Sequence, residues 1–237
     1  AYALLLDTHP NTFHLGLGAS LAQANLLLIE ADGFGLKYHF PNGRVNESEV
    51  KDKTAFSFTD SLGHRKHIVL SGGAKANDYE GFRGPNYGTA YINEGNLLHL
   101  NSLNEAKDRT MSSKLPKIIV TQNPDNPNAP FYVDFEKNWQ CREDKYINDN
   151  PNDVYDGEDF RYFHFTQHDN PSLTKERIAK NERSFASDVE LKRNFYGMRI
   201  ASEGLIYDMI TDANYYTIPL SMVSKENMDR YIGVDAG

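Results

Sequence analysis

Short apolar segments alternate with helical segments along residues 1–121, and this rhythm constrains the fold more than any other feature of the sequence. Ser20 stands where the N-cap of one of these helices is expected, and Gly33 and Gly35 interrupt the helical pattern after it. Strands that alternate with helices are typical of an α/β fold with a mostly parallel sheet flanked by helices. The expected buried strands are residues 12–19, 67–70, 89–92 and 117–121.

Residues 36–66 predict an excursion of strands and turns from this rhythm. Pro41-Asn42-Gly43 is a turn signal, and residues 55–59 alternate apolar and polar side chains with the period of a strand. Residues 1–7 have the composition of the end of a helix. A further helix is expected within residues 96–113, with one apolar face formed by Leu97, Leu100, Leu103 and Ala106.

The character of the chain changes after residue 121. Residues 122–157 are rich in Asn, Asp and Pro and predict loops around an aromatic segment, and Arg161–Phe165 predicts a strand. Helices are expected after Ser172 and over Asp188–Tyr196. We therefore expect three parts: residues 1–121 as the core of the fold, residues 122–228 as the rest of that domain with a small lid or linker subdomain, and residues 229–237 as the opening strand of a further domain.

The charge balance limits the partners that the chain can have. The net charge is −8 and the sequence pI about 5.5, so nucleic acid can be bound only through local basic patches. Cys141 is the only cysteine, which excludes an internal disulfide and favours a reducing, cytoplasmic setting. The longest apolar stretch, around residues 26–29, is far too short to span a membrane.

The segment Thr89–Glu94 is the sharpest candidate for chemistry. An apolar strand that ends in a polar residue followed by Glu is the Walker B arrangement of ATPases that have a phosphate-binding loop. In that arrangement the polar residue, here Asn93, holds Mg²⁺ and the Glu, here Glu94, orients the attacking water. The same pattern also fits an ordinary buried strand with a solvated end, so the segment alone does not decide between the two.

Two further features stand at suggestive positions. Thr121, Gln122 and Asn123 follow the last predicted strand, where polar side chains of an open parallel sheet line a ligand crevice. Arg83 lies 11 positions before Glu94 on a glycine-flanked loop, and such an arginine can neutralise transition-state charge in a neighbouring site. The alternatives are an ordinary Asn-Pro turn and a surface arginine.

The order and spacing of these features resemble the large terminase subunit of tailed bacteriophages. The features follow one another in this order: an arginine-glycine pair, a strand ending in Glu94, a helix with an arginine, and a strand ending in T-x-N-P. The closing YIGVDAG resembles the first strand of that family's RNase H-like nuclease domain. Other similar segments are EADGFGLKYHF, LSGGAKANDYEGFRG, NEAKDRT, NPDNPNAPFY, HFTQHDNPSL and SEGLIYD.

The resemblance implies a P-loop NTPase-type sheet of the RecA/ASCE-like class with a small lid subdomain. It implies a motor that uses ATP and Mg²⁺ to move double-stranded viral DNA into the capsid and that cuts concatemeric DNA. The implied partners are the DNA, the small terminase subunit and the portal protein, with the large subunit forming a homo-oligomeric ring on the procapsid in the host cytoplasm and no membrane contact.

The resemblance also assigns roles to residues. Glu94 would be the catalytic glutamate, and Arg83 an arginine finger acting on a neighbouring subunit. Thr121, Gln122 and Asn123 would form the coupling motif that contacts nucleotide and senses hydrolysis. Asn93 departs from the family, which usually has a Mg²⁺-binding Asp there, and a neutral oxygen would hold the metal more weakly. Asp235 would be the first carboxylate of the nuclease metal site.

The largest departure is the absence of the phosphate-binding loop G-x-x-x-x-G-K-[ST] from the sequence. The glycine runs HLGLGAS and SGGAKAN lack the Gly-Lys-Ser/Thr ending. We expect the loop to lie before Ala1 and the other nuclease residues after Gly237, so that this chain alone is inactive.

Two alternatives to a motor remain open. The missing loop is also expected of a non-catalytic P-loop-like assembly or scaffolding module of a phage particle. A carbohydrate-active domain with paired carboxylates is the other. The histidines show no spacing typical of zinc. Three basic clusters fit either solvated helix faces or a DNA channel: Lys107, Arg109, Lys114 and Lys117; Lys175, Arg177, Lys180 and Arg183; and Lys192, Arg193 and Arg199.

Overall fold

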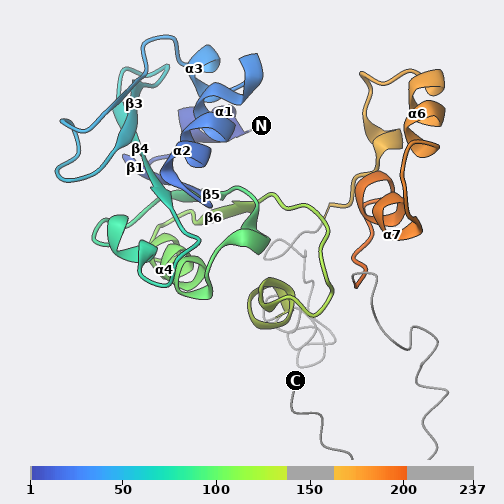
Figure 1. Cartoon of the computed structure of the whole chain (residues 1–237). Coiled ribbons are helices and arrows are strands. Elements are labelled where there is room, and N and C mark those ends of the chain that lie inside the picture. The colour runs from blue at the N-terminus through green and yellow to red at the C-terminus, as the bar shows by residue number, and fades with distance from the viewer. Residues whose placement is uncertain (1, 138–162, 202–237) are drawn as a thin grey trace, which may run out of the picture. The chain divides into compact units, whose positions relative to one another are not determined.

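A six-stranded mixed sheet with helices on both faces forms the centre of the protein, in the strand order β2-β3-β4-β1-β5-β6 (Figure 1). The computed structural model describes residues 2–137 and 163–201. The strands are β1 (Phe13–Gly18), β2 (Arg44–Asn46), β3 (Ala55–Thr59), β4 (Arg65–Gly72), β5 (Thr89–Ile92) and β6 (Lys117–Val120).

The helices connect and cover these strands. The α-helices are α1 (Tyr2–Thr8), α2 (Leu21–Ala24), α3 (Leu36–His39), α4 (Leu100–Met111), α6 (Lys175–Glu182) and α7 (Asp188–Glu190). The π-helical segments are η1 (Asn25–Glu30), η5 (Phe131–Glu136) and η7 (Leu191–Phe195). The 3-10 turns are η2 (Ala31–Gly33), η3 (Asp78–Gly81), η4 (Gly95–Leu97) and η6 (Gln167–Asp169).

Parallel pairing holds the part of the sheet that the sequence predicts as parallel. β1 lies between β4 and β5 and pairs parallel with both, and β5 pairs parallel with β6. The excursion in residues 36–66 supplies β2 and β3, which extend the sheet beyond β4 by antiparallel pairing. The prediction of an α/β fold with a mostly parallel sheet is confirmed.

Alternate residues of each strand enter two different cores, as the period of a strand requires. On β5, Ala90 and Ile92 enter the core that α4 and η5 cover, while Tyr91 faces the other side. On β4, Val69 belongs to the first core, and Ile68 belongs to the second with residues of α1 and η1. Both faces of the sheet are therefore buried, which explains the apolar strand sequences.

The helix expected after Ser20 forms, but it is irregular. Ser20 is its N-cap, with the side chain accepting a hydrogen bond from the backbone of Gln23. Gly18, just before the cap, lies so close to α2 that a Cβ atom there would come within 2.7 Å of the Ala24 nitrogen. The helix ends at Ala31 and Asp32, whose φ angles of 38° and 46° are left-handed.

The aromatic segment that the predicted loops of residues 122–157 surround is helical in part. Phe131 and Phe135 of η5 are buried and belong to the same core as Leu103 of α4. The apolar rings therefore override the Asn- and Pro-rich sequence that precedes them. The strand expected at Arg161–Phe165 is wrong for its described part, since residues 163–165 have no regular structure.

The helices after residue 165 enclose a small core of their own around Phe195. This ring is fully buried and makes edge contacts with His168, Phe185 and Tyr196. The helical segments η6, α6, α7 and η7 thus form a second, aromatic cluster, which we call the Phe195 cluster.

Candidate active site

The carboxyl ends of β5 and β6 bring together four of the residues that the sequence singles out. Thr121, directly after β6, donates a hydrogen bond from its Oγ1 to Oδ1 of Asn93 at 3.0 Å. Asn123 donates from Nδ2 to Oε1 of Glu94 at 3.4 Å. Two side-chain hydrogen bonds therefore link the two polar strand ends, at the carboxyl side of the sheet where open parallel sheets bind ligands. We call these carboxyl ends of β5 and β6 the Asn93–Glu94 edge.

Backbone hydrogen bonds between neighbouring strands hold this edge in place. The Asn93 nitrogen donates to Leu17 O at 2.9 Å, and the Thr121 nitrogen donates to Ile92 O at 2.9 Å. The Gly95 nitrogen returns a bond to Thr121 O at 3.0 Å. A Cβ atom on Gly95 would approach Val120 to 2.6 Å, so glycine permits this close contact of the two strand ends.

Glu94 has an unusual backbone conformation at this edge. Its φ of 51° and ψ of 54° lie in the left-handed region, which costs a non-glycine residue about 1–2 kcal/mol. Such outliers persist where the surroundings impose them, and they are concentrated at functional sites. Glu94 is partly exposed, so its carboxylate is accessible to water.

Gln122 points elsewhere, although it stands between Thr121 and Asn123. Its Nε2 donates to Oε2 of the buried Glu136 at 3.3 Å. The structure therefore divides the three polar residues, with the first and third at the β5 edge and the second directed to η5.

Arg83 lies apart from these residues. Its side chain is 57% exposed, forms an ion pair with Glu105 of α4 at 3.6 Å, and lies 5.8 Å from the ring centre of Tyr79. Nothing in the described residues places it against Glu94 of the same chain. An exposed guanidinium of this kind fits a group that acts outside its own site. Asp235 lies outside the described residues.

Three further residues lie next to the edge and were not linked to it from the sequence: Tyr132, Glu136 and Arg199, the last of which was predicted only as a member of a basic cluster. Glu136 and Arg199 form a bidentate ion pair with both N–O distances at 2.8 Å, although 63 positions separate them. Arg199 also lies 3.9 Å from the ring centre of Tyr132. Only the FYVDFE segment gave a local signal, since its rings are spaced to bury one helical face.

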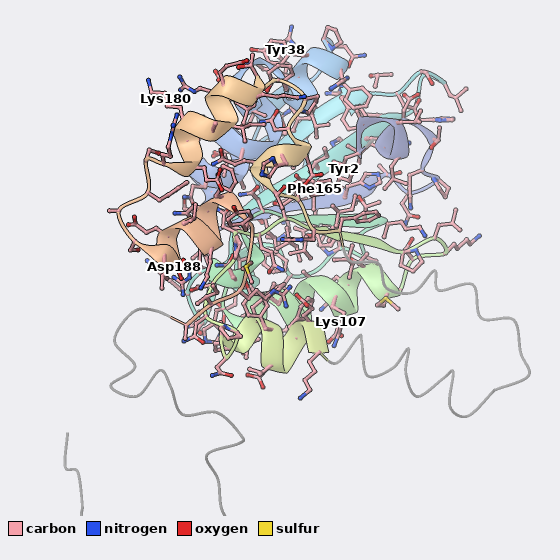
Figure 2. All side chains as sticks on the ribbon, turned by 90° about the vertical axis from the view of Figure 1, so that its right-hand side faces the viewer. Tyr2, Tyr38, Lys107, Phe165, Lys180 and Asp188 are labelled. Atoms are coloured by element: carbon pink, nitrogen blue, oxygen red, sulfur yellow. The ribbon has the colours of Figure 1, made fainter. Side chains whose placement is uncertain are left out.

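The three basic clusters have different environments. Lys175, Arg177, Lys180 and Arg183 are exposed along α6, and Lys180 extends outward from the helix (Figure 2). In the first cluster, Arg109 pairs with Glu105 at 2.8 Å, whereas Lys114 and Lys117 are exposed. The third cluster is no simple solvated face, because Arg199 is directed to Glu136.

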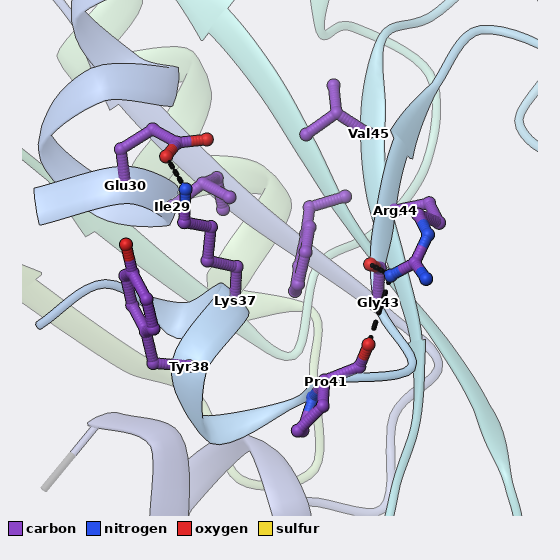
Figure 3. A pocket seen from close by; sticks show the side chains of 9 residues that line it. Ile29, Glu30, Lys37, Tyr38, Pro41, Gly43, Arg44 and Val45 are labelled. Atoms are coloured by element: carbon purple, nitrogen blue, oxygen red, sulfur yellow. Dashed lines mark hydrogen bonds and ion pairs between the residues drawn. The ribbon is translucent and has the colours of Figure 1, made fainter. Parts of the chain in front are cut away.

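A cavity of about 470 Å³ lies at the other end of the sheet, between η1, α3 and the β2–β3 hairpin (Figure 3). Glu30 and Lys37 pair with each other at its wall, and Arg44 donates to the carbonyls of Pro41 and Gly43. The charged groups of this cavity are thus engaged by their own neighbours, and the cavity is separate from the Asn93–Glu94 edge.

The donor set at the β5 edge fits one part of a nucleotide site. The Asn93 amide oxygen and the Glu94 carboxylate are oxygen ligands of the kind that bind Mg²⁺ directly or accept hydrogen bonds from its waters. No glycine-rich loop with a lysine is present to hold phosphates. Within residues 2–137 and 163–201 there is no cluster of three His, Cys, Asp or Glu side chains that could hold a metal. In the same residues no helix is long and apolar enough to cross a membrane.

Comparison with known proteins gives a consistent answer from solved structures. No family model and no curated protein matches the chain. The large terminase from a thermophilic bacteriophage has a TM-score of 0.63 and 21% identity, over 90% of this chain and 47% of that one. The same protein in complex with ADP gives a TM-score of 0.64 with the same identity.

A second phage protein has the same fold. The large terminase ATPase domain of Thermus phage P74-26 has a TM-score of 0.52 and 15% identity, over 84% of this chain and 81% of that domain. The chain spans about half the length of the first of these two terminases. The resemblance that the sequence predicts is thus confirmed at the level of fold: this chain has the fold of the ATPase domain of phage large terminases.

Proposed function

We propose that the chain is part of the ATPase domain of a large terminase subunit, which uses ATP to translocate double-stranded viral DNA into the capsid. The observation that carries this proposal is the contact of Asn93 and Glu94 with Thr121 and Asn123 at adjacent parallel strand ends, in a chain with a large terminase fold. The structures of the thermophilic bacteriophage terminase in complex with ADP and with ATP-gamma-S support ATP as the nucleotide.

The residues of the edge have separate tasks in this proposal. Glu94 orients the attacking water and accepts its proton, because its carboxylate is partly exposed beyond the strand end. Asn93 holds Mg²⁺ directly or through water by its Oδ1, which already accepts the Thr121 hydroxyl. ATP with Mg²⁺ supplies the phosphoryl group whose transfer to water drives the motor.

Thr121 and Asn123 sense hydrolysis, because each is bonded to one of these two side chains. Gln122 belongs to the same coupling motif, although it contacts Glu136 here. Arg83 serves a neighbouring subunit of a homo-oligomeric ring on the procapsid, as its exposure allows. The exposed lysines and arginines of α6 contact DNA phosphates, where a few contacts per subunit suffice.

The remaining assignments rest on the sequence resemblance. Asp235 binds a nuclease metal in the part of the protein that cuts concatemeric DNA. The small terminase subunit and the portal protein are the partners, and the host cytoplasm is the place of assembly.

The test is the change Glu94→Gln in the full-length protein. The amide keeps the size of the side chain but cannot accept a proton, so ATP hydrolysis should fall by about 10²–10⁴-fold. ADP affinity should stay within about threefold of the wild-type value, because Glu94 contributes no phosphate contact in this proposal. Glu80→Gln, on the exposed turn η3, is the matched control and should retain full activity. Undiminished hydrolysis in Glu94→Gln would remove this residue from the mechanism.

A second candidate is a non-catalytic assembly or scaffolding module of a phage particle. It is favoured by one observation, the lack of any G-x-x-x-x-G-K-[ST] sequence. Calorimetric titration of the full-length protein with ADP separates the two functions. Binding supports the motor, and no heat at millimolar ADP supports the module.

A further inference from the structure

Glu136 and Arg199 connect the Asn93–Glu94 edge to the Phe195 cluster. Glu136 is 6% exposed and is the last residue of η5, directly after the buried Phe135 of the main core. It accepts two hydrogen bonds from Arg199 and one from Gln122. A buried carboxylate needs such partners, because its removal from water costs free energy that hydrogen bonds and an opposite charge offset.

The Gln122 side of this connection leads directly to the edge. Gln122 follows Thr121, whose hydroxyl bonds to Asn93 and whose carbonyl accepts the Gly95 nitrogen. The Oε1 atom of Gln122 is buried and has no hydrogen-bond partner in the described part of the chain. The contact with Glu136 is therefore what fixes the amide, and a shift of Glu136 would move the residue that follows Thr121.

A second route runs through Tyr132. Its hydroxyl donates to the Asn123 carbonyl at 3.4 Å and accepts from the Asp125 nitrogen at 3.1 Å. Burial raises the pKa of this phenol, although the nearby Arg199 lowers it, so the hydroxyl stays protonated and able to donate at neutral pH. Arg199 lies over the ring of the same tyrosine, and Asn123 bonds to Glu94.

The Arg199 side of the connection leads to the Phe195 cluster. Arg193 of η7 donates from Nε to the Ile200 carbonyl at 2.9 Å, next to Arg199 in the chain. Arg193 also lies 3.8 Å from Asp125, in the loop after β6. The segment that carries Arg199 is thus held to η7 through Ile200 and to η5 through Glu136, while Arg193 of η7 itself lies near the loop after β6.

We propose that Glu136 and Arg199 are positioning residues that form a latch between the Asn93–Glu94 edge and the Phe195 cluster. Through the latch, the stability of the backbone at the Asn93–Glu94 edge depends on the position of the Phe195 cluster. By thermodynamic linkage, a change at the edge also alters the stability of the cluster. The nucleotide-dependent part of this inference rests on the proposed function, and the nucleotide-free part does not.

The first experiment needs no nucleotide. Hydrogen exchange is measured on the chain with Arg199→Gln and, separately, Glu136→Gln, with Lys75→Gln on an exposed turn as the control. The latch predicts faster exchange in η7 and at least about tenfold faster exchange at the amides of Gly95 and Thr121. The tenfold change at these two amides corresponds to a coupling free energy of about 1.4 kcal/mol. The control should change neither.

A purely local role gives a different result. If exchange rises in η7 but stays within about twofold of wild type at the two edge amides in both variants, the latch is refuted. Arg199→Lys guards against general unfolding, because it keeps the charge and the stem while losing the two parallel bonds. This variant should show the same pattern at a smaller magnitude, and an unchanged edge in a folded Arg199→Lys protein likewise counts against the latch.

The second experiment adds ADP to the full-length protein. In the wild type, ADP should change exchange in η7 by at least about fivefold, and Arg199→Gln should abolish that change while ADP affinity stays within about threefold. An equal ADP response in the variant refutes the latch. If the wild type binds no ADP, the proposed function fails, and the nucleotide-free experiment alone decides the latch.

Discussion

Lys66 should be one of the most important single residues for stability. It lies in β4, its side chain is only 4% exposed, and its ammonium group reaches the end of α1. Nζ donates to Leu6 O at 2.7 Å, to His9 O at 2.6 Å and to Asp7 O at 3.3 Å, and it lies 3.2 Å from the buried carboxylate of Asp60. The lysine therefore satisfies carbonyls that a helix end leaves unpaired and balances a buried charge.

The change Lys66→Met keeps the length of the side chain and removes these four contacts. Loss of one partner of a buried ion pair costs about 3–5 kcal/mol of folding free energy. The three carbonyls that lose the ammonium add no separate cost, because water can reach them as the helix end loosens. With a urea m-value of about 2 kcal/mol/M, the unfolding midpoint should fall by about 2 M. Urea titrations followed by circular dichroism measure this shift.

A control and a double mutant make the reasoning refutable. Lys75→Met, on an exposed turn, should leave the midpoint unchanged. Asp60→Asn keeps the Oδ1 atom that accepts from the Leu62 and His64 backbone but removes the charge, so Lys66→Met/Asp60→Asn should lose about 1–3 kcal/mol less than the sum of the single changes. Additive effects, or a loss below about 1 kcal/mol for Lys66→Met, would show that the ammonium is not the source of stability.

Three other changes test separate parts of the structure. Burial, with the charges of His9 and Lys66, lowers the pKa of His14 to about 3 from its ordinary 6.5, so the unfolded chain binds the extra proton between these values. The stability that comes from keeping His14 neutral is fully present above pH 6.5 and is lost as the pH falls toward 3. The change His14→Asn should therefore reduce the slope of the unfolding free energy against pH by about 1.4 kcal/mol per pH unit near pH 5. In the full-length protein, Asn93→Asp should preserve the Thr121 bond and lower the Mg²⁺ concentration for half-maximal ATP hydrolysis about tenfold, since a charged ligand binds the ion more tightly; an unchanged requirement would remove Asn93 from the metal site. Mixing full-length Arg83→Ala with Glu94→Gln subunits should restore part of the ATPase activity that each lacks alone, and no recovery at any ratio would argue against action on a neighbouring subunit.

The sheet was predictable because its signal is local. From Ala90 to Ile92 on β5 and from Ile118 to Val120 on β6, successive side chains enter the two cores alternately, so both strands are apolar up to their ends at Asn93 and Thr121. Two such strand ends in a parallel sheet must share one edge. The contact of Thr121 with Asn93 is consistent with that topology, although the sequence predicted only the two strand ends and not the contact.

The remainder of the site depends on contacts that no local pattern encodes. Glu136 meets Arg199 across 63 positions, and Lys66 meets Leu6 across 60. The left-handed backbone of Glu94 has no glycine or asparagine at that position to announce it. It arises because the Gly95 nitrogen must reach the Thr121 carbonyl, which is a demand of the neighbouring strand.

The residue at position 93 shows how such long-range contacts bear on function. Oδ1 of an aspartate would accept the Thr121 hydroxyl as well as Oδ1 of Asn93 does, so this hydrogen bond does not require a neutral side chain. The difference between the two residues is electrostatic. Glu136 is balanced by Arg199, whereas Glu94 forms no ion pair with a lysine or arginine among the described residues. A second carboxylate at position 93 would thus add like charge beside Glu94. When no metal cation is bound, this repulsion would destabilise the folded arrangement of the two strand ends. If Asn93 holds Mg²⁺ as proposed, its neutral amide keeps like charge away from Glu94 before the metal binds, at the expense of metal affinity.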